Sequence, residues 1–243
     1  MADQKITGVD FSHWQAQVNF EKLVQANIVF AIVKAGEILV RKQGKPEYKD
    51  NQHDRNIAGL KAAQIICGDY YYFHPSAGAS KQARHYAQLY LKNEPDLPPI
   101  IDVEDHDGMK PSDVANELFA FIDGLRDKIG REPIIYSTNS FLVSRVGNPS
   151  WDRKTLFWIA RYNTAIKELS EKIKQNVVMW QYTDRLKLPG LPAMDGNYWL
   201  RELSELYKLA NKDESSPIPV ELEVVYARMG IRSRYLERLF RGA

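Results

Sequence analysis

The chain of 243 residues is long enough for one large domain, or for a domain with a small appendage. Its 33 Lys and Arg against 31 Asp and Glu give a net charge of +2, so charge alone does not favour a nucleic acid or a membrane as partner. The single cysteine, Cys67, excludes an internal disulfide, and its apolar neighbours favour a small buried side chain.

Strand-like apolar runs alternate with helical patterns along most of the chain. The runs cover residues 5–11, 29–36, 67–74, 98–104, 132–138, 156–162 and 177–183, with a shorter one at 194–199. Helical patterns cover residues 20–26, 51–63, 80–91 and 111–129, between the first five runs. In the last pattern the apolar residues Val114, Leu118, Phe121, Ile122 and Leu125 recur at helical spacing.

This order of elements predicts an α/β fold. Five β-α units followed by three strands with little helix between them are typical of an irregular TIM-like barrel. The competing arrangement is a doubly wound open sheet. We expect residues 1–199 to form the barrel and residues 200–243 to form a short helical C-terminal tail.

Two carboxyl groups end the apolar run of residues 98–104. Asp102 and Glu104 are two positions apart, so both side chains project to the same face of a strand. Close carboxyls push their pKa values apart, which lets one stay protonated near neutral pH while the other is ionised. Such a pair suits an acid-assisted hydrolase, in particular one that cleaves glycosidic bonds. The structural alternative is that the pair caps the next loop or meets a Lys or Arg.

Further polar and aromatic side chains end the other strand-like runs. The C-terminal strand edge carries the chemistry of a parallel barrel, so Asp10 and Asp195 are expected on the same rim. Aromatic faces pack on the apolar faces of sugar rings, and amides bind their hydroxyls. The predicted substrate-binding residues are Trp14, Tyr70, Tyr72, Tyr136, Tyr162, Trp180, Gln181, Tyr182 and Asn197.

Nine motifs resemble, in the same order, those of the glycoside hydrolase family 25 lysozymes. They are DFSHWQ at 10–15, FAIVKAGE at 30–37, GDYYYFHP at 68–75, QARHYA at 82–87, IIDVE at 100–104, PIIYS at 133–137, LFWIARYN at 156–163, MWQYTD at 179–184 and MDGN at 194–197. Each motif is weak alone, but nine in one order make a specific signal. The resemblance spans about residues 5–199 and extends to the N-acetylmuramidases that many phages use as endolysins. The family fold, a barrel of five β-α units and three further strands, agrees with the predicted elements.

The resemblance implies a peptidoglycan hydrolase that cleaves the β-1,4 bond between N-acetylmuramic acid and N-acetylglucosamine. It implies that Glu104 is the general acid and that Asp102 assists the transition state, with Asp10 and Asp195 as the outer acidic positions. The sequence departs from the family pattern at Tyr71, Tyr72 and His74, and in the segment that contains Glu37; these departures concern the subsites.

Two routes follow from these assignments. Glycoside hydrolysis passes through an oxocarbenium-like transition state, which needs a proton for the leaving oxygen and negative charge or a nucleophile near the anomeric carbon. In the substrate-assisted route, the 2-acetamido oxygen attacks this carbon and Asp102 stabilises the acetamido group. In the other route, water attacks directly with a second Asp as base. The sequence leaves retention and inversion both open.

No cofactor or metal is expected. Asp105, His106 and Asp107 are adjacent in the sequence and cannot all point at one ion, which favours a solvated loop. A Ser/His/Asp hydrolase is disfavoured because no G-x-S-x-G elbow is present. The alternative from another functional class is a non-catalytic cell-wall-binding barrel.

The tail is rich in arginine near its end. Its last 16 residues hold five Arg against the single acidic residue Glu237. One hypothesis is a helical extension that packs on the barrel, and the other is a small module that binds an anionic envelope polymer or a membrane surface. A helix-turn-helix is less supported because a second recognition feature is missing, so no nucleic-acid partner is expected. We expect a monomer.

The sequence also suggests a route of delivery. Residues 1–11 contain no apolar signal region, and no segment is long and apolar enough to span a membrane. We therefore expect the protein to accumulate in a host cytoplasm and to act on the cell wall after the membrane is opened.

Overall fold

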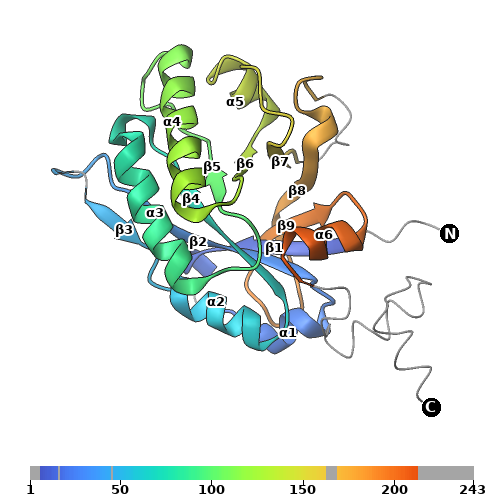
Figure 1. Ribbon diagram of the computed structural model, residues 1–243. Helices are drawn as coiled ribbons and strands as arrows, with labels where there is room; N and C mark the ends of the chain where they lie inside the picture. The colour runs from blue at the N-terminus through green and yellow to red at the C-terminus, as the bar shows by residue number, and fades with distance from the viewer. Residues whose placement is uncertain (1–5, 16, 45, 163–168, 213–243) are drawn as a thin grey trace.

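Eight strands close into a barrel in the computed structural model, which describes residues 6–15, 17–44, 46–162 and 169–212 (Figure 1). The strands are hydrogen-bonded in the order β1, β2, β4, β5, β6, β7, β8, β9 and back to β1. Their bounds are Ile6–Phe11, Phe30–Ile38, Ile66–Tyr72, Ile100–Asp102, Ile134–Ser137, Leu156–Ala160, Val177–Leu186 and Met194–Trp199. A short strand, β3 (Glu47–Lys49), extends the sheet by pairing with the end of β2.

The helices follow the first five barrel strands. They are α1 (Phe20–Gln25), α2 (His53–Ala62), α3 (Ala79–Asn93), α4 (Pro111–Ile129) and α5 (Asn139–Ser144). Single 3-10 turns lie at η1 (His13–Gln15), η2 (Pro75–Ala77) and η3 (Lys174–Asn176). In the part of the chain that the structure describes, no α-helix separates β7, β8 and β9. The predicted five β-α units and three further strands are therefore confirmed.

The direction of β9 closes the barrel. From β1 through β8 the barrel strands run parallel, whereas β9 is antiparallel to both β8 and β1. Because β1 pairs with β2 on one side and with β9 on the other, the sheet has no open edge between its first and last strands. The alternative of a doubly wound open sheet is therefore wrong.

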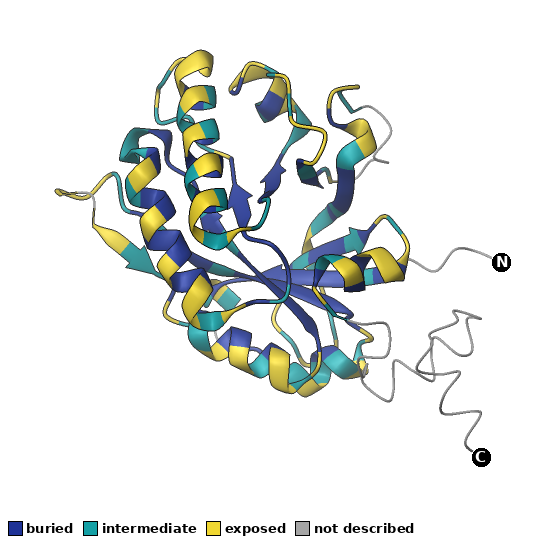
Figure 2. Cartoon of the chain, in the orientation of Figure 1, coloured by how far each residue is buried: buried dark blue, intermediate teal, exposed yellow. Residues whose placement is uncertain are grey.

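Alternation along each strand divides the core into two layers. On β5, Ile100 packs inside the barrel with Ile32 and Trp158, while the next residue, Ile101, packs outward among side chains of α3 and α4 such as Phe121. Successive strand residues face opposite sides of a sheet, and both sides here are covered. Figure 2 shows the result: the barrel strands are mostly buried, and the helices are buried along one side only.

Helix α4 shows how local sequence and packing agree. Pro111 occupies its first turn, where a missing backbone N–H costs nothing, and its five predicted apolar positions are buried. Gly130 ends it with a φ of 75°, a left-handed conformation that glycine adopts without strain. The helix thereby fixes the far end of the loop that begins after Asp102.

A sixth helix, α6 (Leu203–Leu209), lies just beyond the predicted barrel boundary. Its Leu206 is fully buried and belongs to the same apolar cluster as Trp199. The ammonium of Lys212 then lies 3.1 Å from a carboxylate oxygen of Asp96. The first part of the tail thus packs on the barrel, while residues 213–243 lie outside the described residues, so the division at 199/200 stays a prediction. Among the described residues, no helix has the length and apolarity to cross a membrane.

Candidate active site

The four predicted acidic residues lie at one end of the barrel. Asp102 is the last residue of β5 and Glu104 follows two positions later. Asp10 lies near the end of β1 and is paired in register with Asp195 near the start of the antiparallel β9. Both Asp195 and Asp10 therefore reach the edge where the parallel strands end, although they are far apart in the sequence.

Asp10 is buried and accepts two hydrogen bonds on one oxygen. Gln181 Nε2 donates to Asp10 Oδ2 over 2.9 Å, and Asn197 Nδ2 donates to the same atom over 2.7 Å. Burial and then the neighbouring carboxylate of Asp195 raise the pKa of Asp10 to about 8, although the two amides oppose this shift. The Asp10 carboxyl is thus held mostly protonated at neutral pH.

Gln181 connects Asp10 with Asp195. Its Nε2 also donates to Asp195 Oδ2 over 3.2 Å. Its Oε1 accepts hydrogen bonds from the hydroxyls of Tyr136, at 2.8 Å, and Tyr162, at 2.6 Å. The two hydroxyl donors fix the orientation of the amide, since only its NH₂ side can then face the carboxyls. Burial and the charge of Asp184 raise the pKa of Asp195 to about 6.

Asp102 is a buried carboxyl with an unused oxygen. Its Oδ1 has no hydrogen-bond partner among the described residues, although it is shielded from solvent. Burial, followed by repulsion from Glu104, holds the pKa of Asp102 well above its usual range. A buried polar atom without a partner is costly, so a ligand that supplies a donor at this point would be stabilised.

Glu104 faces solvent at the mouth of the barrel. It lines a cavity of about 460 Å³ together with the polar segment Thr138–Ser140 and the end of β7 through Arg161 and Tyr162. Surrounding protein atoms and then the charge of Asp195 raise the pKa of Glu104. A carboxyl that is accessible and has a raised pKa is suited to donate a proton to a bound molecule.

The backbone before Glu104 is held on both sides. The N–H of Val103 donates to the carbonyl of Tyr136 over 2.9 Å, and the hydroxyl of Ser137 donates to the Val103 carbonyl over 2.6 Å. Both partners belong to β6, so the neighbouring strand positions the residue between the two carboxyls.

The tyrosines of β4 divide between the two layers. Tyr70 and Tyr72 lie on the side of the carboxyls, and the charge of Asp102, after burial, raises the pKa of both phenols. Tyr71 faces the helices and its hydroxyl lies 2.9 Å from His85 Nδ1. The ammonium of Lys34 lies 5.3 Å from the centre of the Tyr72 ring, and its charge lowers the pKa of Asp102.

Trp14 stands out from the rim. Its side chain is 81% exposed, and its ring centroid lies 4.7 Å from that of His13. His13 is in turn anchored, because its Nδ1 lies 2.6 Å from an oxygen of the buried Asp50. An exposed indole on a fixed support offers a face on which a sugar ring can stack.

Two of the predicted groove residues face away from the carboxyls. Trp180 and Tyr182 flank Gln181 on β8, and strand alternation places them on the opposite face of the sheet. There the ring of Tyr182 stacks on Tyr198 of β9 at 4.1 Å, and Trp180 Nε1 donates to the Arg161 carbonyl over 2.9 Å. Of this predicted triplet, the structure brings only Gln181 into contact with the acidic residues.

Asn197, the last predicted site residue, is fully buried. Trp158 Nε1 donates to its Oδ1 over 2.8 Å, which turns its NH₂ toward Asp10. The role of Trp158 was not predicted from the sequence, nor was that of Lys34. The sequence nevertheless contained a signal for both residues, because each occupies a strand position whose side chain faces the inside of the barrel.

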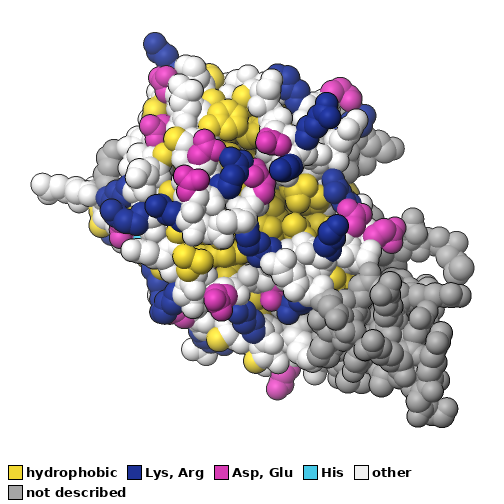
Figure 3. Space-filling view, viewed as in Figure 1, with side chains coloured by type: hydrophobic (Ala, Val, Ile, Leu, Met, Phe, Trp, Pro, Cys, Tyr) yellow, Lys and Arg dark blue, Asp and Glu magenta, His cyan; other side chains and the backbone are white. Residues whose placement is uncertain are grey.

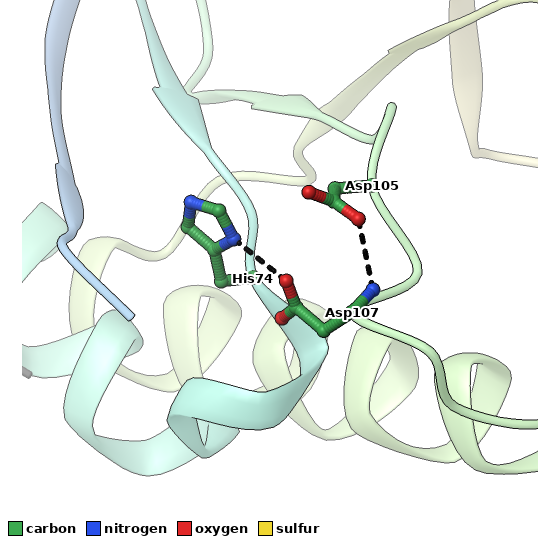
Figure 4. Close-up of side chains that lie close together, drawn as sticks. All are labelled: His74, Asp105 and Asp107. Atoms are coloured by element: carbon green, nitrogen blue, oxygen red, sulfur yellow. Dashed lines mark hydrogen bonds and ion pairs between the residues drawn. The ribbon is translucent and has the colours of Figure 1, made fainter. Parts of the chain in front are cut away.

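A network of charged side chains lies beside the site (Figure 4). His74 Nδ1 lies 3.1 Å from Asp107 Oδ1, and His74 Nε2 lies 3.2 Å from Glu37 Oε2. Figure 4 also shows Asp105, whose Oδ1 accepts the backbone N–H of Asp107 at 2.8 Å. Atoms of His74, Asp105 and Asp107 that could ligate a metal lie within 4.8 Å of one another. His106, which the sequence placed beside this pair, is not part of the group.

The hydrogen bonds of this network favour a charged imidazole. Burial alone would lower the pKa of His74, but hydrogen bonds to Glu37 and Asp107 raise it. Burial would likewise raise the pKa of Glu37, yet His74 and Lys34 lower it to about 2. The network therefore ties the end of β2 to the loop that carries Glu104.

Comparison with known proteins places the chain in a family. The sequence profile described as "Glycosyl hydrolases family 25" matches residues 9–191. Lysozyme M1 of Streptomyces globisporus is 25% identical over 220 residues, which cover 85% of this chain and 71% of that protein. The solved structure of a muramidase from Acremonium alcalophilum is 26% identical, with a TM-score of 0.74 over 86% of this chain and 100% of that chain.

A third similarity concerns the fold alone. The catalytic domain of the endolysin ply40 from bacteriophage P40 of Listeria monocytogenes has a TM-score of 0.68 at 21% identity, over 87% of this chain and 100% of that chain. The profile covers most of the barrel, including Asp10, Asp102 and Glu104. The chain therefore belongs to glycosyl hydrolase family 25 and is a glycoside hydrolase.

Proposed function

We propose that this protein is a muramidase that cleaves the β-1,4 bond between N-acetylmuramic acid and N-acetylglucosamine in peptidoglycan. The observation that carries the proposal is the pairing of buried Asp102, whose Oδ1 lacks a partner among the described residues, with solvent-facing Glu104 two positions later. Similarity to a lysozyme and to a muramidase supports the choice of substrate.

Glu104 acts as the general acid. Its raised pKa keeps a proton available as pH approaches neutrality, and its place on the cavity wall gives it access to a bound glycan. As the bond between the anomeric carbon and the leaving oxygen breaks, the Glu104 proton passes to that oxygen. General acid catalysis of this kind contributes about 10²–10⁴-fold to the rate.

Asp102 orients the 2-acetamido group of the sugar. Its free Oδ1 accepts the acetamido N–H, which turns the acetamido carbonyl oxygen toward the anomeric carbon. That oxygen forms a bond to the carbon as the leaving group departs, and the hydrogen bond that Asp102 Oδ1 accepts from the N–H stabilises the positively charged ring that results. Water then attacks the same carbon, the bond to the acetamido oxygen breaks, and Glu104 takes the proton of the water.

Asp10, Asp195 and Gln181 form the opposite wall of the site. A pKa of about 8 for Asp10 keeps its carboxyl mostly neutral, so it can hydrogen-bond a sugar hydroxyl as well as accept from the two amides. Asp195, with a pKa of about 6, carries charge at neutral pH and raises the pKa of Glu104. Asp195 thus supports the protonated state of Glu104 that the acid step needs.

The test is the identity of the bond that is cut. Purified protein is incubated with peptidoglycan, and the products are reduced and analysed by mass spectrometry; reducing N-acetylmuramic acid ends are expected. Glu104→Gln should lose at least about 10²-fold in rate. Normal activity of that variant, or products with reducing N-acetylglucosamine ends, would refute the assignment. The substrate-assisted route further predicts retention at the anomeric carbon, measured by ¹H NMR of the first-formed product.

Non-catalytic wall binding is the alternative. It predicts that peptidoglycan captures the protein without bond cleavage, and that Glu104→Gln changes nothing. The crowding of four carboxyls favours catalysis, because a binding wall has no need of groups whose pKa values are raised at a cost in stability.

The motif order also supports a narrower proposal, that the enzyme serves as a phage endolysin. In that role it acts from a host cytoplasm once the membrane has been opened. Expression in a bacterial host should leave cells intact until the membrane is permeabilised, after which turbidity should fall quickly. Wall degradation in cells with sealed membranes would contradict this role.

A further inference from the structure

A second cavity lies at the end of the barrel opposite to the carboxyls. It has a volume of about 440 Å³ and is lined by the starts of β7 and β8, the end of β9, and helix α6. Its apolar floor is formed by Leu156, Val178, Trp199 and Leu209. Figure 3 shows hydrophobic side chains at the surface beside α6, bordered by Lys and Arg. We call this feature the basal cavity.

The rim of the basal cavity carries two available cations. Lys154 and Lys208 line it and are exposed, and neither ammonium is in an ion pair within the described part of the chain. An apolar floor between such cations fits a ligand with one apolar face and one anionic face.

The two carboxylates on the rim are already neutralised. Glu132 accepts two hydrogen bonds from Arg126, at 2.8 and 2.9 Å, and Glu205 lies 3.3 Å from Arg201. A third rim cation, Arg131, donates to the carbonyl of Leu209 and so fixes the end of α6. The charge that remains for a ligand is therefore positive.

We propose that residues 218–225 of this chain dock in the basal cavity as an extended segment. Asn211 lines the cavity, so the chain leaves the described structure at the rim itself. The following segment, residues 213–225, holds four acidic residues and no basic one. Within it, Val220, Leu222 and Val224 alternate with Glu221 and Glu223.

This alternation suits the two faces of the cavity. In an extended segment, alternate side chains point to opposite sides, so the three apolar residues share one face. They would cover the apolar floor, while Glu221 and Glu223 approach Lys154 and Lys208. Pro217 and Pro219 favour an extended backbone at the entry to the segment.

The tether favours this occupant over a second molecule. Nine residue steps separate Asn211 from Val220, and each step spans at most about 3.3–3.6 Å. Since Asn211 already lines the cavity, a linker of this length is long enough for Val220 to reach the cavity floor. A short linker gives the segment an effective concentration of about 1 mM or more, well above the concentration of a separate chain in solution.

The test is a charge exchange in the full-length chain. Hydrogen–deuterium exchange followed by mass spectrometry should show slowed exchange for residues 218–225 in the wild type. E221K/E223K should abolish that protection, as should K154E/K208E, and the four changes together should restore at least part of it. Glu237→Lys, elsewhere in the tail, and Lys42→Glu, on an exposed loop, are the matched controls and should leave protection unchanged. Melting temperatures establish that each variant is folded.

Three outcomes would overturn the proposal. Residues 218–225 could exchange at the rate of an unstructured peptide in the wild type. Protection could disappear on dilution while light scattering shows dimers at the higher concentration, which would make a second copy the occupant. Polyphosphate, used as an anionic probe, could bind in a manner that depends on Lys154 and Lys208 while the segment stays unprotected.

Peptidoglycan cleavage is a separate readout, and it should be unchanged in K154E/K208E because the carboxyls lie at the other end of the barrel.

Discussion

Asp10 lies directly opposite Asp195 on the antiparallel strands β1 and β9, and one amide nitrogen, that of Gln181, bridges the two carboxyls. This arrangement joins the first and last barrel strands at the candidate active site. It also places two acidic groups where only one can easily be charged, which adds to burial in raising the pKa of Asp10.

Asp10→Asn should stabilise the protein at alkaline pH. The folded-state pKa of about 8 lies above the ordinary value of 3.8, so folding favours the protonated carboxyl. The stability it provides is fully present below about pH 4 and is lost as pH rises through about 8. Asn cannot ionise, so its advantage should grow over this range to at least about 1 kcal/mol, or about 3 °C in melting temperature.

The measurement is the melting temperature of both proteins between pH 4 and pH 9. Asp127→Asn, an exposed change on α4, is the control and should show no such trend. A difference between Asp10→Asn and wild type that is the same at pH 5 and pH 9 would contradict the pKa assigned to Asp10.

Asp195→Asn should move the alkaline limb of the activity profile to lower pH. After burial, the negative charge of Asp195 raises the pKa of Glu104, so removal of that charge should lower the pKa. Glu104 then loses its proton at lower pH. The quantity to measure is kcat/KM against pH, since this profile reports the free enzyme. A limb that stays in place while the maximum falls would show that Asp195 acts only by contacting the substrate.

His74→Ala should destabilise the protein most in mildly acidic solution. The raised pKa of His74 makes its contribution fully present below about pH 6.5 and lost as pH rises through the folded-state value. Glu37 and Asp107 have lowered pKa values, so their contribution is present at mildly acidic pH and is lost only in stronger acid. We expect a loss of about 2 kcal/mol near pH 5.5 and a smaller one at pH 9, measured by urea unfolding.

Lys34 and Asp105 also face this network, and a Lys34 variant provides the check. Lys34→Met removes the ammonium that donates to Glu37 Oε1 over 2.7 Å but keeps the imidazole, so its effect should change much less between pH 5.5 and pH 9 than that of His74→Ala. A His74→Ala loss that is equally constant would show that the imidazole is neutral in the folded protein.

Trp14→Ala should weaken substrate binding without affecting the fold. The indole is 81% exposed, so its removal costs little packing, but a stacked sugar would lose about 1 kcal/mol. KM for soluble glycan fragments should then rise about fivefold at unchanged melting temperature. Leu91→Ala, another exposed apolar residue at 51%, lies on α3 and is the control. Equal KM values for both variants would remove Trp14 from the binding surface.

Local sequence patterns predicted most of the architecture. Helix α4 was predicted at its observed bounds because an apolar stripe and an initial proline agree, and Gly130 ends it in the structure. The short strand β3 was not predicted, and the helix of the fifth β-α unit, α5, was predicted without bounds, since three to six residues carry too little periodicity. For α5 a signal was present in Thr138, whose side chain accepts the N–H of Phe141 and caps the helix.

The site was likewise predicted only as far as local sequence patterns carry information about it. Carboxyls that end strands stand out against apolar runs, so Asp10 and Asp102 could be found without a structure. Asp195 lies near the start of the antiparallel β9, and the family resemblance was needed to assign it. Trp180 and Tyr182 were assigned to the groove with Gln181, although adjacent residues of a strand normally face opposite sides and the rings of both contact Tyr198 instead. The orientation of Gln181 depends on hydroxyls from β6 and from the end of β7, and no local pattern contains that information.

The antiparallel strand β9 has a consequence for synthesis of the protein. Asp195 and Asn197 reach the barrel only when the last strand enters between β8 and β1. A ribosome adds about 5–20 residues per second, so Asp10 must wait on the order of ten seconds or more for the partner that hydrogen-bonds it. Until then the barrel lacks its closing strand and the candidate active site lacks one wall. A nascent chain that stops before β9 should therefore have no ability to damage a cell wall, so activity would begin only when the barrel is finished.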